Sequence, residues 1–117
     1  MCGIQVNYTM AAIAATDRLI ERAPETAAAA IRAIVKTQAA LRQNVAGATE
    51  VGRKLFPPSE AELIAELIRR DLPYYDPTIS EAFVAGMNQF ARDIGILAGH
   101  VPYSQVVATQ FRLLWRQ

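Results

Sequence analysis

The stretch from Ser80 to Gln110 constrains the fold most, because it joins an amphipathic pattern to helix signals at both ends. Apolar residues recur there at intervals of four, three and four, which is the spacing of one helical face: Phe83, Met87, Phe90 and Ile94. Ser80 stands at an N-cap position. Gly95 can end the helix, because glycine adopts the left-handed C-cap conformation at little cost. This pattern predicts a helix over residues 81–94.

Similar signals predict helices along the rest of the chain. Thr16 is a candidate N-cap for a short helix, and Pro24 suits the first position of a long one that Gly47 ends. Ser59 and Glu62 have the spacing of a capping box. Besides 81–94, the predicted helices span residues 17–22, 24–45, 49–56, 60–71 and 103–115. On the helix over 60–71, Glu66 lies four residues before Arg70, the favourable order for an ion pair.

One strand is predicted, at the N-terminus, because apolar and polar residues alternate from Gly3 to Met10. The expected fold is therefore mainly α: six or seven helices packed as a small bundle with one N-terminal β-strand. A chain of 117 residues fits a single domain over residues 1–117. We expect the face of the 81–94 helix to form the core together with Ile31, Val35, Leu63 and Leu67.

Composition argues against several classes of function. The 12 basic and 11 acidic residues nearly cancel, whereas a nucleic-acid binder shows a basic face. No run reaches the roughly 18 apolar residues of a membrane span, so no membrane insertion is expected. The first residues lack the basic and apolar regions of a signal peptide, so the chain as written is expected to stay in the cytoplasm. One cysteine and one histidine form neither a disulfide nor a zinc site.

No set of residues has the spacing that catalysis needs. Gly95 and Gly99 lack the lysine and the spacing of a phosphate-binding loop. The polar and aromatic residues that could carry chemistry are interpreted as loop or surface residues, or as a free thiol: Cys2, Asp71, Tyr74, Tyr75, Asp76, Glu81, His100 and Ser104. We therefore expect no enzyme activity, no catalytic residue, no metal and no cofactor, and we assign no ligand-binding residue.

Three segments, taken in order, resemble the C-terminal part of substrate-binding proteins of ABC importers of the nitrate, sulfonate and taurine type, which are related to the thiamine-pyrimidine synthases. The segments are ATDRLIERAPE (15–25), IVKTQAALRQN (34–44) and ISEAFVAGMNQFARDIGILAGHVPYSQVVATQF (79–111). The residues that match the family's order and spacing are Thr16, Asp17, Leu19, Ile20, Pro24, Glu25, Phe90, Gly95, Leu97, Val101 and Pro102.

The resemblance implies a solute-binding component for a small organic or inorganic anion, such as a sulfonate, taurine or nitrate. It implies a periplasmic location, an ABC permease as partner, and a type II periplasmic-binding-protein fold of which this chain is a C-terminal fragment. The alternative is a stand-alone helical oligomerisation or interaction module without ligand binding. A lone strand leaves an unpaired edge that favours pairing with another copy. We therefore expect a homo-oligomer formed through the N-terminal strand.

Overall fold

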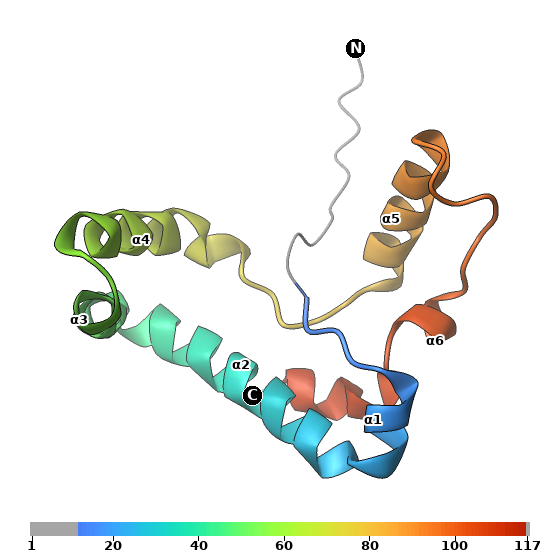
Figure 1. Ribbon diagram of the computed structural model, residues 1–117, viewed down its shortest axis with the longest axis horizontal. Coiled ribbons are helices and arrows are strands. Elements are labelled where there is room, and N and C mark those ends of the chain that lie inside the picture. Colours follow the sequence, from blue (N-terminus) through green and yellow to red (C-terminus); the bar gives the residue numbers. More distant parts are fainter. Residues whose placement is uncertain (1–11, 117) are drawn as a thin grey trace.

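The computed structural model describes residues 12–116, and in this part of the chain the regular elements are all helices (Figure 1). They are the α-helices α1 (Asp17–Arg22), α2 (Pro24–Gln43), α3 (Val45–Leu55), α4 (Pro58–Asp71), α5 (Glu81–Asp93) and α6 (Tyr103–Val106), and the 3-10 helices η1 (Leu72–Tyr74) and η2 (Thr109–Trp115). The prediction of a mainly helical chain is confirmed. The strand predicted over residues 3–10 lies outside the described residues.

Three helix starts form as the sequence predicts. The hydroxyl of Thr16 accepts a hydrogen bond from the Leu19 N–H at 3.2 Å and caps α1. Pro24 occupies the first turn of α2, where its missing N–H is not needed. The hydroxyl of Ser80 caps α5 by accepting from the Phe83 N–H at 3.1 Å.

The C-terminal end of α5 also forms as predicted, with Gly95 as the capping glycine. Gly95 has a φ of +79°, the left-handed conformation that glycine adopts without a Cβ clash. Its N–H donates to the Arg92 carbonyl at 3.0 Å, and the Ile96 N–H reaches back to the Ala91 carbonyl at 2.9 Å. These two hydrogen bonds make a Schellman motif, which satisfies carbonyls that the helix leaves free.

Other helix boundaries differ from the prediction. Asn44, rather than Gly47, separates α2 from α3: its side-chain oxygen accepts from the Gly47 N–H at 3.2 Å, so Gly47 lies inside α3. The Ser59–Glu62 capping box does not form, because α4 begins at Pro58 and Glu62 pairs with Arg53 instead. The helix predicted over residues 103–115 is interrupted at Val107 and Ala108, between α6 and η2.

The helices form an open arrangement rather than the expected packed bundle. In Figure 1, α3 and α4 project to one side of α2, and α5 stands apart from them at the far end of a connector over residues 75–80. The radius of gyration is 17.0 Å, whereas a compact domain of this length has about 13 Å. Among the described residues, no large side chain is fully buried.

The most extensive contact between two helices joins α3 and α4, and small residues allow their close approach. Ala61 and Ala65 of α4 are each 1% exposed. A Cβ placed on Gly52 of α3 would lie 3.7 Å from the Cβ of Ala61, so the two helices approach to van der Waals contact there. A second contact joins η2 to α2, with Phe111 buried on η2 and Ala28 and Val35 buried on α2.

The predicted core is wrong in its main part. Phe90 is 53% exposed, and most of the residues expected around it are exposed as well, at 40% for Met87, 50% for Ile94, 56% for Leu63 and 39% for Leu67. Of the expected core residues, Val35 is buried, while Ile31 and Phe83 are half-buried. The side of α5 that is buried carries Val84 and Asn88, because it faces the loop that returns after Gly95.

Asn88 holds that returning loop against α5. Its side-chain amide donates to the Val101 carbonyl at 2.9 Å and to the Val84 carbonyl at 3.1 Å, and its side-chain oxygen accepts from the Val101 N–H at 2.9 Å. Asn88 is only 5% exposed, so these bonds satisfy a polar group that would otherwise be costly to bury. Asn88 lies outside the predicted apolar face of α5, and it is buried because of these hydrogen bonds rather than by apolar periodicity.

Candidate functional site

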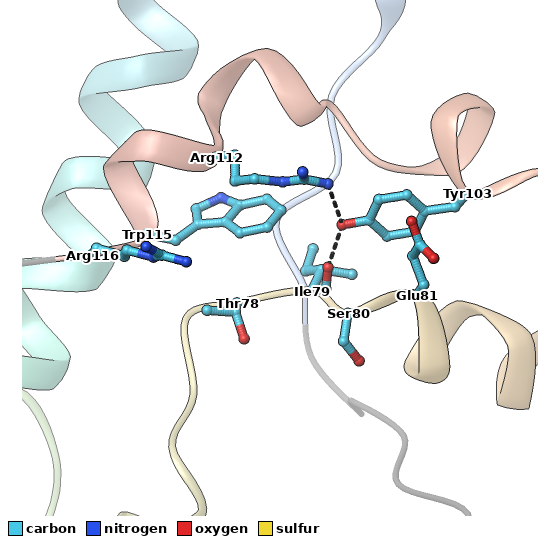
Figure 2. Close-up of a pocket in the computed structure, with 8 residues that line it drawn as sticks. All are labelled: Thr78, Ile79, Ser80, Glu81, Tyr103, Arg112, Trp115 and Arg116. Carbon is cyan, nitrogen blue, oxygen red and sulfur yellow. Dashed lines mark hydrogen bonds between the residues drawn. The ribbon is translucent and has the colours of Figure 1, made fainter.

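A groove of about 340 Å³ is the candidate binding site in the described part of the chain. It lies where the start of α5 meets the C-terminal segment, as Figure 2 shows. The groove is lined by Thr78, Ile79, Ser80, Glu81, Tyr103, Arg112, Trp115 and Arg116. Chain segments more than twenty residues apart in sequence therefore form its two walls.

Tyr103 links the two walls of the groove. Its hydroxyl donates a hydrogen bond to the Ile79 carbonyl, on the connector that leads into α5. The Arg112 guanidinium donates to the same hydroxyl at 3.5 Å, which is long for a hydrogen bond, and its carbon lies 5.8 Å from the centre of the Tyr103 ring. Arg112 thus stacks on Tyr103 in a cation–π contact, and this contact fixes one side of the groove.

The charged side chains of the groove favour an anionic group. The ion pairs of residues 12–116 are Glu25–Arg32, Arg53–Glu62 and Arg70–Asp71, so neither Arg112 nor Arg116 is paired with a carboxylate there. Glu81 is the one carboxylate in the lining, against two arginines and an indole N–H from Trp115. The arginines are exposed, so water and salt screen their attraction for an anion.

Residues singled out in the sequence do not converge on this groove, apart from Glu81. His100 and Ser104 are exposed, at the loop before α6 and in α6. Tyr74 is 83% exposed, whereas Tyr75 is half-buried and its carbonyl accepts from Arg42. Cys2 lies outside the described residues.

The two aspartates expected in turns have local partners. Asp76 accepts hydrogen bonds from the N–H and the hydroxyl of Thr78 at 2.9 and 2.8 Å, which closes the turn before α5. The Arg70 guanidinium donates to both oxygens of Asp71, at 2.7 and 3.0 Å, and these hydrogen bonds lower the pKa of Asp71. Arg70 therefore pairs with Asp71, and not with Glu66 as the sequence spacing predicted.

The groove was not predicted, because its lining comes from the connector, the start of α5, α6 and the C-terminal segment, and no local sequence pattern shows that these segments meet. The available signal was the pair Arg112 and Arg116, four residues apart beside Trp115. Within residues 12–116, no group of three or more histidine, cysteine, aspartate or glutamate side chains could hold a metal ion. In the same part of the chain, no helix is both long and apolar enough to cross a membrane.

Comparison of the chain with protein-family models, with curated proteins and with solved structures finds no match. The site is therefore interpreted from its own residues.

Proposed function

We propose that this chain is the helical part of a solute-binding component of an ABC importer for a small organic or inorganic anion, such as a sulfonate, taurine or nitrate. The observation that carries the proposal is the uncovered apolar surface of α3, α4 and α5. Side chains such as Leu55, Leu63 and Phe90 are 70%, 56% and 53% exposed. Helices of this kind are stable when their apolar faces pack against another layer. In a complete binding protein, the α/β lobes would be that layer.

In this proposal the chain does not hold the anion by itself. A desolvated anion needs several donors that converge on it from both lobes, because an unpaired charge is costly to bury. The groove beside Arg112 lies open to water, and both of its cationic donors, Arg112 and Arg116, come from the C-terminal segment. The chain is then a structural part of one lobe, without enzyme activity, and acts in the periplasm with an ABC permease as the partner of the complete protein.

The alternative is a stand-alone helical module that forms an oligomer and binds no ligand. The same exposed apolar side chains favour it, because large apolar patches mark interaction surfaces. In that case the apolar faces are covered by another polypeptide, and the chain has no role in anion transport.

The coding sequence upstream of Met1 separates the two functions. The proposal requires a continuous reading frame that encodes two α/β lobes, and the expressed product of that frame should bind one of the anions in calorimetry. A stop codon and promoter directly upstream would contradict the proposal and leave the helical module. A continuous frame whose product binds none of taurine, alkyl sulfonates, nitrate and bicarbonate would contradict the proposed substrate class.

A further inference from the structure

The part of the groove formed by η2 and Arg116 carries an aromatic ring beside two cations. Trp115 is half-buried and lines the groove together with Arg112 and Arg116, which are exposed. In Figure 2 the Trp115 indole and the Arg112 guanidinium both point toward Tyr103. Such a combination can contact the face of a planar ring with the indole and a negative charge with a guanidinium.

The groove is also large enough for a ring. Its volume of about 340 Å³ lies within the usual range for small-molecule sites, about 300–1,000 Å³. Trp115 and Ile79 contribute apolar surface to the lining, and the Ile79 carbonyl is held by the hydrogen bond from the Tyr103 hydroxyl. Nitrate, bicarbonate and taurine would leave this apolar surface in contact with water, whereas a ring would cover it. Apolar burial therefore favours an aromatic ligand.

The charged side chains of the lining favour a negative charge on that ligand. Two cations, Arg112 and Arg116, stand against one carboxylate, Glu81. Arg112 is already stacked on Tyr103, whereas Arg116 has no ion-pair partner within residues 12–116. The guanidinium of Arg116 is therefore available to a ligand, and its planar fork matches the two oxygens of a carboxylate.

We propose that the groove binds a small aromatic carboxylate, with its ring against Trp115 and Ile79 and its carboxylate at Arg116. Because Arg116 is exposed, water and salt screen the ion pair, and the ring contact contributes most of the affinity. The expected dissociation constant is on the order of 1 mM, since only a few contacts offset the cost of association. The inference does not rest on the proposed function, because all of these contacts are made by residues of this chain.

The first experiment compares three ligands on the unmodified chain at constant ionic strength. Trp115 is the only tryptophan in the sequence, so its fluorescence reports on the groove directly. Benzoate should change this fluorescence along a saturating curve. Acetate, which lacks the ring, should bind about fivefold more weakly or worse, the usual effect of losing one stacked ring. Benzamide keeps the ring without the charge and should bind about threefold more weakly, the effect of one exposed ion pair.

The second experiment follows benzoate by ligand-detected NMR, which does not require tryptophan. Trp115→Leu should weaken binding about fivefold, and Arg116→Gln about threefold. The matched controls remove an aromatic ring or a cation elsewhere: Tyr74→Leu, at a side chain that is 83% exposed, and Arg69→Gln, at an exposed position of α4. Both controls should leave the affinity for benzoate unchanged. Circular dichroism checks that each variant keeps its helices.

A variant that gains affinity provides a test that loss of folding cannot imitate. Glu81 is the only carboxylate among the described lining residues and repels the ligand, so Glu81→Gln should tighten benzoate binding about twofold. Equal binding of benzoate and acetate would overturn the inference, as would affinity that neither Trp115→Leu nor Arg116→Gln changes. The reading frame upstream of Met1, which tests the proposed function, has no bearing on these titrations, so either idea can fail while the other holds.

Discussion

Gly95 adopts the left-handed backbone conformation that ends α5. This conformation predicts how much stability is lost when Gly95 is replaced. Its φ is +79°, and a Cβ added there would meet no atom within 4 Å. Gly95→Ala should therefore lower the free energy of unfolding by about 1 kcal/mol, because the backbone strain of alanine at a positive φ outweighs the entropy it removes from the unfolded chain. Thermal melts followed by circular dichroism measure the change. Gly99→Ala is the control, because Gly99 also has open space but no positive φ. Equal effects of the two substitutions would contradict this account.

Asp71 is predicted to titrate below its ordinary pKa of 3.8, because Arg70 donates hydrogen bonds to its carboxylate. Because the pKa of Asp71 is lower in the folded state than in the unfolded state, this carboxylate stabilises the fold at pH values above its unfolded-state pKa. The stabilisation is lost as the pH falls through the folded-state pKa. Side-chain NMR titration measures the pKa directly. Arg70→Gln should raise the pKa of Asp71 toward 3.8. An unchanged pKa in this variant would mean that another group holds the carboxylate.

The α3–α4 pair depends on small side chains at its contact. Ala65 is 1% exposed, so Ala65→Leu would force the helices apart and should cost about 1–3 kcal/mol of stability. Ala46→Leu, at an exposed position of α3, is the control and should change stability little. Urea unfolding of both variants gives the comparison. Equal midpoints would show that the pair tolerates a wider separation.

Helix starts and stops were predictable where one residue determines them. Thr16, Pro24, Ser80 and Gly95 act locally, and each has the predicted role. Asn44 was missed because its side chain caps α3 inside what reads as one continuous helical pattern. The predicted core failed for a different reason. Periodicity shows that Phe90 lies on an apolar face, but it does not show whether a partner for that face lies in the same chain.

The candidate site could not be predicted from the sequence, because it depends on how segments distant in sequence meet in the tertiary structure. Tyr103 reaches the Ile79 carbonyl across 24 positions of sequence, and no local pattern encodes that contact. The burial of Asn88 was not predictable either, because two of its three hydrogen bonds go to Val101, thirteen positions away.

For the whole molecule, we predict that the 117-residue chain binds no small anion tightly. Arg112 and Arg116 of the groove are exposed, so water competes with any anion there. Calorimetry with taurine, alkyl sulfonates, nitrate and bicarbonate should show no heat beyond dilution. Arg112→Gln is the control for any weak signal. Micromolar binding that disappears in Arg112→Gln would show that the groove alone is a complete site.

The close contact of α3 with α4 has a consequence for the order in which the chain folds. The two helices are adjacent in sequence and joined by a turn at Phe56 and Pro57, so bringing them together closes only a short loop. Such local contacts form quickly, whereas η2 must find α2 across more than sixty intervening residues. In pulsed hydrogen-exchange refolding, amides of α3 and α4 should gain protection first. The C-terminal segment, and the groove that depends on it, should be protected last.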